Sequence, residues 1–124
     1  MTGTDPSTLA PDNPFWVVGD VHGRADLLDQ ILARILPDGL PVVLVGDYVN
    51  KGPDSARVLL RLRDLSEAGQ VIPLRGNHDD LFLRFLSRPL QQGRAFRRFG
   101  GGATLASFGC PTPAVDAPRR DYAA

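Results

Sequence analysis

Three short glycine-flanked motifs carry the residues of this chain that could bind metal ions or transfer protons. They read Gly-Asp-Val-His-Gly at 19–23, Gly-Asp-Tyr-Val-Asn-Lys-Gly at 46–52 and Gly-Asn-His-Asp at 76–79. Both histidines of the sequence and its single lysine fall inside these motifs. Scattered carboxylates carry little information, but the rarest polar residues gathered beside them predict a metal-dependent catalytic site.

The mixture of donor atoms narrows the kind of metal. Asp20, His22 and Asp47 offer two carboxylates and an imidazole, and Asn77 offers a neutral carbonyl oxygen. Oxygen and nitrogen donors together suit manganese, iron or zinc better than calcium. The carboxylate of Asp47 could bridge two cations about 3.5–4 Å apart, which would lower the pKa of a bridging water and clamp an in-line displacement at phosphorus.

Two further residues could complete such chemistry. His78 could be the general acid that protonates a leaving alkoxide, and Lys51 could neutralise phosphate charge. Plainer interpretations exist: a lone Asp20 after a strand could be a turn residue or a helix cap, and Asn50 could orient His78 or only occupy a tight turn. The shared placement of these residues in three motifs favours a site over the plainer interpretations.

Each motif follows a short apolar run of the kind that forms buried parallel strands, at 15–18, 42–45 and 71–74. The motifs begin at residues 19, 46 and 76, hence 27 and 30 residues apart, which is roughly the length of one βαβ unit. Ligands of parallel sheets bind beyond the carboxyl ends of the strands. We therefore predict an α/β fold in which the three motifs converge on one surface.

The segments between the runs show helical periodicity. Pro53 suits the first turn of a second helix, a third should run over 79–88, and a shorter one should lie around 95–99. We expect the glycine triplet at 100–102 to be a flexible lead-in to a last helix. Pro73 removes a ladder donor and places the third strand near a sheet edge. Six apolar residues should form one buried face of the first helix: Leu27, Leu28, Ile31, Leu32, Ile35 and Leu36.

Composition and charge restrict the class of protein to which this sequence can belong. The sequence is 43% hydrophobic with a formal net charge of zero, which indicates a globular domain and argues against non-specific attraction to nucleic acid or acidic membranes. It has neither a bilayer-length apolar run nor a signal-peptide pattern, and its lone Cys110 fits a reducing cytoplasm. We expect a flexible leader at 1–14, one domain at 15–109 and an irregular tail at 110–124.

The three motifs resemble the signature of the calcineurin-like metallophosphoesterases, in the branch of the Ser/Thr phosphoprotein phosphatases and the symmetrical diadenosine tetraphosphatases. That signature has the forms GDxHG, GDxxDRG and GNH followed by Glu or Asp. The resemblance covers residues 15–109 and implies a βαβαβα half of the αββα sandwich of this family. It also implies two divalent metal ions, with manganese favoured and iron or zinc as alternatives.

The resemblance implies a metal-binding role for four residues. Asp20 and His22 would hold the first metal, Asp47 would bridge the two metals, and Asn77 would hold the second. A metal-bridging hydroxide would then attack phosphorus.

It implies catalytic and phosphate-binding roles for the neighbouring residues. His78 would protonate the leaving group, while Lys51 and Asn77 would bind phosphate oxygens. Asn50 stands where the phosphatases have an aspartate that hydrogen-bonds this histidine, and Lys51 stands where they have an arginine. Asn50 can accept a hydrogen bond but carries no charge, and a lysine lacks the bidentate fork of an arginine.

Three functions stay open at this point. The first is hydrolysis of phosphomonoesters of the Ser/Thr protein phosphatase type, because the runs at 74–78 and 101–109 look like those of bacterial phosphatases. The second is symmetrical hydrolysis of diadenosine tetraphosphate, which Asn50 and the Gly-Pro-Asp-Ser run at 52–55 favour. The partner would be a phosphoprotein or a nucleotide, respectively.

The third function is a non-catalytic fragment or interaction module. Members of the family have two further metal-binding histidines, and this sequence has none after His78. On that basis we expect the site of this chain to be incomplete by itself. Self-association or a missing C-terminal half would then supply the remaining ligands.

Overall fold

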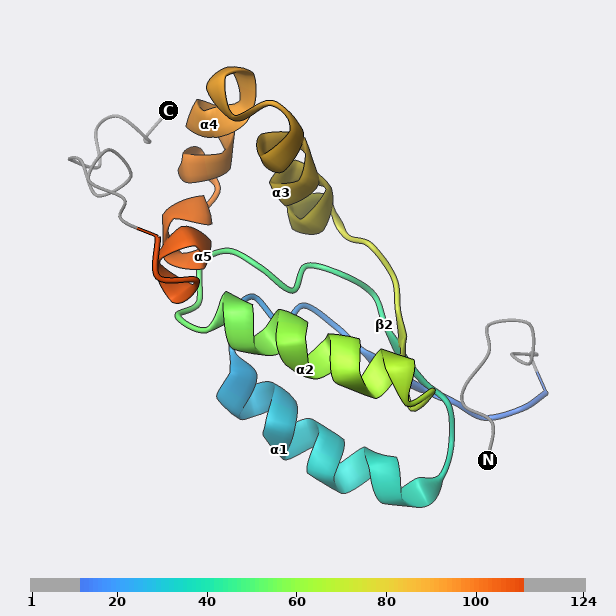
Figure 1. Ribbon diagram of the computed structural model, residues 1–124. Coiled ribbons are helices and arrows are strands. Elements are labelled where there is room, and N and C mark those ends of the chain that lie inside the picture. Colours follow the sequence, from blue (N-terminus) through green and yellow to red (C-terminus); the bar gives the residue numbers. More distant parts are fainter. Residues whose placement is uncertain (1–11, 111–124) are drawn as a thin grey trace.

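The computed structural model describes residues 12–110, so the predicted leader and tail lie almost wholly outside it. Figure 1 shows the chain coloured along its length. The elements in order are β1 (Trp16–Val18), α1 (Ala25–Ile35), the 3₁₀ helix η2 (Leu36–Asp38), β2 (Val42–Leu44), α2 (Ser55–Glu67), β3 (Ile72–Pro73), α3 (Asn77–Ser87), α4 (Pro89–Arg98) and α5 (Gly101–Ser107). This order confirms the predicted βαβαβα pattern and the α/β fold class.

The described strands form a small parallel sheet in the order β1-β2-β3. Val17 pairs with Val43 and Leu44 pairs with Pro73, so β2 is the central strand. All three residues of β2 are buried, as a strand with neighbours on both sides requires. Pro73 lies in an edge strand of this sheet, as its missing N–H predicts.

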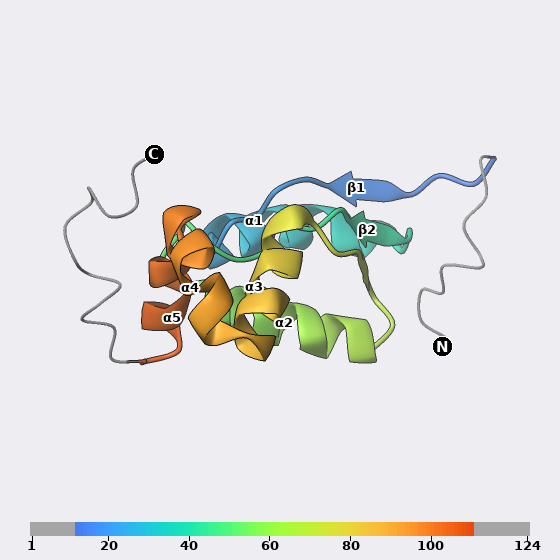
Figure 2. The ribbon, with the colours of Figure 1, turned by 90° about the horizontal axis from the view of Figure 1, so that it is seen from above.

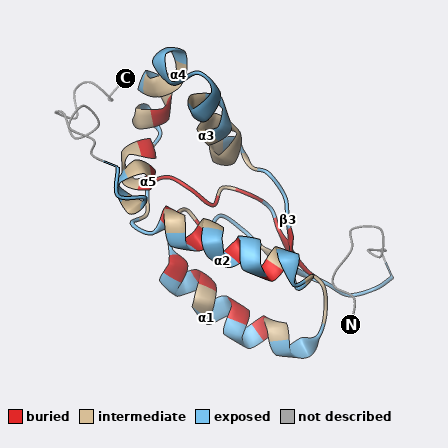
Figure 3. Cartoon of the chain, viewed as in Figure 1, coloured by how far each residue is buried: buried red, intermediate tan, exposed pale blue. Residues whose placement is uncertain are grey.

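The core lies between the sheet and helices α1 and α2. The two helices run side by side in Figure 1, and in Figure 2 the strands β1 and β2 lie along the opposite side of the molecule from α2. Figure 3 shows buried residues on β2 and as stripes along both helices. The apolar residues of this core include Leu28, Leu32, Ile35, Val42, Leu44, Val58, Leu62 and Leu65.

Helices α3 and α4 pack against each other as a second unit, and α5 connects that unit to α2. Phe96 of α4 is fully buried and stacks on Phe82 and Phe85 of α3, with ring centroids 5.4 Å and 4.6 Å away. Stacked aromatic pairs stabilise such helix contacts beyond simple burial. Through this packing, α5 returns to the loop at the end of β2, far from it in sequence.

The structure corrects the predicted burial of two apolar segments. Leu27 and Ile31 are 48% and 39% exposed, because α1 turns Leu28 and Leu32 toward the core instead. The apolar face of α1 is wider than the part of the helix that contacts the core, so Leu27 and Ile31 at its edge stay in solvent. Val17 of the first predicted buried strand is 57% exposed, since β1 is an edge strand of the described sheet.

Several predicted helix limits were also wrong. Pro53 precedes α2 rather than entering its first turn, and α3 begins at Asn77, two residues before the predicted start. Helix α4 runs over Pro89–Arg98, twice the predicted length. The glycine triplet is not a flexible lead-in: Gly100 caps α5 and the next two glycines lie within the helix. Among the described residues, no helix is both long and apolar enough to cross a bilayer.

Candidate metal centre and active site

The three motif loops leave the carboxyl ends of the three strands and meet at one edge of the sheet, as the spacing predicts. Their backbone is unusual. Four non-glycine residues in the described part of the chain have positive φ: His22, Asp47, Asn50 and Lys51, with φ of 43°, 59°, 75° and 75°. All four are predicted site residues. Non-glycine residues rarely adopt this conformation, and such residues concentrate at functional sites.

Backbone hydrogen bonds fasten the first loop to the second. The N–H groups of Val21 and His22 both donate to the carbonyl of Asp47, at 3.1 and 2.9 Å. Gly23 donates to the carbonyl of Tyr48 at 2.8 Å. These bonds fix the relative positions of the side chains that follow the first two strands.

The carboxylate of Asp79 fastens the second loop to the third. Asp79 accepts hydrogen bonds from the backbone N–H groups of Asp47, Tyr48 and Gly76, at 2.6, 2.9 and 2.8 Å. The loops approach closely here, so a Cβ on Gly46 would collide with the backbone nitrogen of Gly76. The third motif includes Asp79, but nothing in its local pattern predicted this role.

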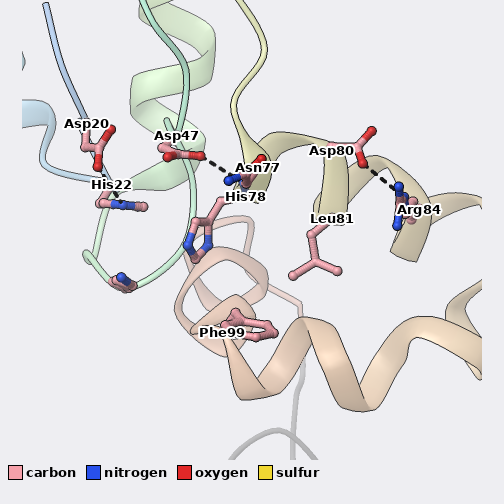
Figure 4. Close-up of a pocket in the computed structure, with 10 residues that line it drawn as sticks. Asp20, His22, Asp47, Asn77, His78, Asp80, Leu81, Arg84 and Phe99 are labelled. Atoms are coloured by element: carbon pink, nitrogen blue, oxygen red, sulfur yellow. Dashed lines mark hydrogen bonds and ion pairs between the residues drawn. The ribbon is translucent and has the colours of Figure 1, made fainter.

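Three predicted metal ligands lie together. Each of Asp20, His22 and Asp47 offers a ligand atom within 4.8 Å of the other two. The Nε2 atom of His22 lies 3.7 Å from a carboxylate oxygen of Asp20, and Figure 4 shows both side chains at the same end of the pocket as Asp47. Two carboxylates and one imidazole at this separation fit a divalent cation that prefers oxygen and nitrogen donors.

The hydrogen bonding of His22 supports a ligand role. Its Nδ1 lies 3.0 Å from the carbonyl oxygen of Val49. A carbonyl only accepts, so Nδ1 carries the proton and Nε2 keeps its lone pair toward Asp20. A partner that fixes the tautomer in this way is typical of metal-binding histidines.

His78 lies next to this cluster. Its ring stands edge-on to that of His22, with centroids 4.8 Å apart, and its backbone N–H donates to Asp47 Oδ1 at 2.8 Å. Its Nδ1 lies 3.1 Å from the amide nitrogen of the fully buried Asn50. Burial first, and the neighbouring His22 second, lower the pKa of His78 below its ordinary value.

The site opens into a cavity of about 520 Å³. Its lining combines the predicted site residues other than Asn50 with one side that the sequence did not predict. Figure 4 shows Leu81 of α3 and Phe99, at the end of α4, facing the same space as His78. Arg84 also lines it and pairs with Asp80 at 3.0 Å. The full lining is Asp20, His22, Asp47, Lys51, Asn77, His78, Asp80, Leu81, Arg84 and Phe99.

Comparison with known proteins places these observations in a family. The family model of the calcineurin-like phosphoesterases matches residues 13–113. A symmetrical bis(5'-nucleosyl)-tetraphosphatase of Acidovorax sp. is 44% identical over 67 residues, which cover 52% of this chain and 23% of that protein.

Two other relatives carry different names. Serine/threonine-protein phosphatase 1 of Salmonella typhimurium is 39% identical over 70 residues, or 55% of this chain and 31% of the relative. A zinc-dependent endopolyphosphatase of Saccharomyces cerevisiae is 36% identical over 76 residues, or 58% and 22%. Each alignment thus spans less than a third of the relative's length. The family model, by contrast, covers most of this chain, which therefore belongs to the calcineurin-like phosphoesterase family.

Proposed function

We propose that this protein is a metal-dependent phosphoesterase whose catalytic domain includes residues 15–109. The observation that carries the proposal is the meeting of Asp20, His22 and Asp47 within 4.8 Å, in a cavity that Lys51 and His78 also line. Carboxylate and imidazole ligands for a metal, next to the ammonium group of Lys51 and the imidazole of His78, suit hydrolysis at phosphorus.

Four residues would hold the metal: Asp20, His22, Asp47 and Asn77. Two divalent ions, manganese in the first instance, would polarise the phosphate and activate a water molecule. The side chains of the protein would bind and orient the substrate. Asn77 is the first residue of α3 and is exposed to the cavity, so its amide oxygen can turn toward the second metal or the phosphate.

Lys51 and His78 would bind the substrate on either side of the reacting phosphorus. Lys51 supplies the one lysine charge of the sequence and neutralises phosphate oxygens as a point charge. His78 directs its ring toward the leaving oxygen, and Asn50 positions that ring through the 3.1 Å contact to Nδ1. Lys51 and His78 would thus act on a phosphate that the metal ions hold beside Asp47.

The substrate we propose first is a phosphomonoester. A second candidate is the symmetrical cleavage of bis(5'-nucleosyl) tetraphosphates, which the name of the Acidovorax relative and the uncharged Asn50 favour. We place the protein in the cytoplasm, because an unpaired cysteine such as Cys110 is typical of reducing compartments.

Calorimetric titration with Mn²⁺ tests the metal site. We expect binding by the wild type, loss of binding in Asp47→Ala, and unchanged binding in Asp64→Asn, whose carboxylate lies on the exposed face of α2. Equal affinity in all three proteins would contradict the proposed site.

Hydrolysis assays on the same proteins test the reaction. We expect Mn²⁺-dependent hydrolysis of p-nitrophenyl phosphate that Asp47→Ala abolishes. Release of nucleoside diphosphate alone from a bis(5'-nucleosyl) tetraphosphate would support the second candidate. Mn²⁺ binding with no turnover of either substrate would instead support the non-catalytic alternative.

A further inference from the structure

A buried polar cluster connects the candidate active site to helix α5. Asn50, Ser55 and Thr104 are fully buried, although all three have polar side chains. Thr104 lies 54 positions after Asn50 and reaches it only because α5 packs against α2. Buried polar atoms must find hydrogen-bond partners, so the pattern within this cluster is tightly constrained.

Thr104 contacts Asn50 twice. Its Oγ1 accepts the backbone N–H of Asn50 at 2.8 Å and donates to the side-chain oxygen Oδ1 of the same residue, also at 2.8 Å. A hydroxyl has one proton, and the alternative acceptor, Ser55 Oγ, is farther away at 3.2 Å. The hydroxyl of Thr104 is therefore used to hold the Asn50 amide oxygen.

This orientation decides which nitrogen of His78 carries a proton. With Oδ1 turned to Thr104, Asn50 presents its Nδ2 to Nδ1 of His78, 3.1 Å away. An amide NH₂ only donates, so Nδ1 of His78 must accept. The proton of the neutral ring then sits on Nε2, at the opposite side of the imidazole from Asn50.

We propose that Thr104 is a positioning residue that locks the Asn50 amide and thereby holds His78 as the Nε2–H tautomer, a hydrogen-bond donor rather than a source of a full proton. A ring with one proton cannot release it to a leaving oxygen without becoming an imidazolate. His78 would instead stabilise an oxygen that departs as an anion. Resting on the proposed phosphoesterase function, this favours aryl phosphates and phosphoanhydrides over alkyl phosphates such as phosphoserine.

His22 provides an internal contrast, because its Nδ1 faces the carbonyl of Val49 and must carry the proton. The two histidines of the sequence are thus expected to be opposite tautomers. One keeps Nε2 free for a metal, and the other keeps Nε2 protonated for a substrate oxygen.

Nitrogen-15 NMR of the metal-free 124-residue chain tests the proposal without any activity. Spectra recorded at about pH 8.5, roughly two units above the ordinary imidazole pKa, identify which nitrogen of a neutral ring carries the proton. The variant His22→Gln assigns the two sets of signals. We expect protonated Nε2 in His78 and protonated Nδ1 in His22. Protonated Nδ1 in His78 of the wild type would overturn the proposal.

Substitutions at Thr104 test whether this residue positions the Asn50 amide. Thr104→Ser keeps the hydroxyl and should keep the wild-type tautomer. Thr104→Val keeps the shape and removes the hydroxyl, so the amide is no longer held and the Nδ1–H form of His78 should appear, with His22 unchanged. A folded Thr104→Val protein with the wild-type tautomer would show that Thr104 does not position His78.

The variant Asn50→Asp supplies a second test should Thr104→Val fail to fold. A carboxylate only accepts hydrogen bonds, so His78 should gain a proton on Nδ1. With Nδ1–H on the carboxylate and Nε2 still protonated, the ring can release its Nε2 proton as a true acid, and the ratio of kcat for p-nitrophenyl phosphate over phenyl phosphate should fall by about tenfold. Absence of a proton on Nδ1 of His78 in Asn50→Asp would contradict the inference, whereas absence of turnover in every protein would contradict only the proposed function.

Discussion

The helical layer and the strand-end loops of this protein are built on different physical principles. Helices α1 and α2 cover β2 with apolar side chains such as Leu28, Leu32 and Val58, each at most 2% exposed. The loops after the strands also bury Val21, Tyr48 and Val49, but their positions relative to one another are fixed by directed hydrogen bonds to carboxylate and carbonyl oxygens. Burial stabilises the first region without regard to direction, whereas the second depends on individual atoms.

The difference separates stability from the candidate chemistry. A change in the helical layer should lower the free energy of unfolding while leaving the proposed metal ligands in place. A change in the loops should disturb the proposed metal ligands even where it lowers the free energy of unfolding by less. Variants that reverse this pattern would show that the two regions are coupled more strongly than their contacts indicate.

The largest effect is expected in the helical layer. Leu28→Ala should lower the free energy of unfolding by about 3 kcal/mol, because it opens a cavity in a filled core. Its neighbour Leu27 is 48% exposed, so Leu27→Ala should cost less than about 0.5 kcal/mol. Urea denaturation measures both. Equal losses would mean that the margin of α1 is covered in solution.

The next effect concerns the link between the second and third loops. Asp79→Asn replaces one accepting oxygen by an NH₂ group that faces backbone donors, and should cost about 2 kcal/mol. It should also weaken Mn²⁺ binding, since Asp79 holds the backbone of Asp47.

Asp80→Asn is the matched control in the same turn of α3. Asp80 pairs at the surface with Arg84 and Arg75, and such pairs contribute less than about 1 kcal/mol. We expect its unfolding and its Mn²⁺ titration to match the wild type. If Asp79→Asn also behaved like the wild type, the three hydrogen bonds would not position the site.

The contrast between these two aspartates shows what the sequence could predict. The βαβαβα order and the meeting of Asp20, His22 and Asp47 follow from strand patterns and motif spacing, because parallel strands end at the same edge. The third motif includes Asp79 and not Asp80, but it does not predict what Asp79 holds, since that depends on which backbone groups lie opposite.

Two other features were equally inaccessible from the sequence. Thr104 contacts Asn50 across 54 positions, and local patterns carry no information on such pairs. The exposure of Leu27 depends on where α2 meets α1, which periodicity does not specify. Sequence patterns therefore predicted which residues meet at the strand ends better than they predicted the groups that hold those residues.

A smaller effect is expected at Tyr48, where the two regions meet. Its hydroxyl contacts the carbonyls of Leu44 and Leu74, at 3.0 and 2.5 Å, and so joins the ends of β2 and β3. Tyr48→Phe should lower the free energy of unfolding at neutral pH by about 1 kcal/mol.

The same residue should make the fold sensitive to alkali. Burial first, and the charge of Asp79 second, raise the pKa of Tyr48 above its ordinary value of 10.0. A raised pKa means that the stabilisation is complete below pH 10 and declines as the pH rises above it, when the unfolded chain loses the proton first. Wild type should lose stability above pH 10 more steeply than Tyr48→Phe. Parallel slopes would contradict this assignment.

The smallest effect is expected at Asp26, in the first turn of α1. Its hydrogen bonds to the guanidinium of Arg24, at 3.0 and 2.9 Å, lower its pKa from 3.8 to about 2. A lowered pKa gives a stabilisation that is present above pH 4 and is lost as the pH falls toward 2. The pair lies at the surface, however, so solvent and salt screen most of that contribution. We therefore expect an NMR titration to show the lowered pKa while the urea midpoint of Asp26→Asn matches that of the wild type at pH 7. A shift of that midpoint as large as the one for Asp79→Asn would break the comparison, because an exposed ion pair would then stabilise the fold as much as the three hydrogen bonds between the loops.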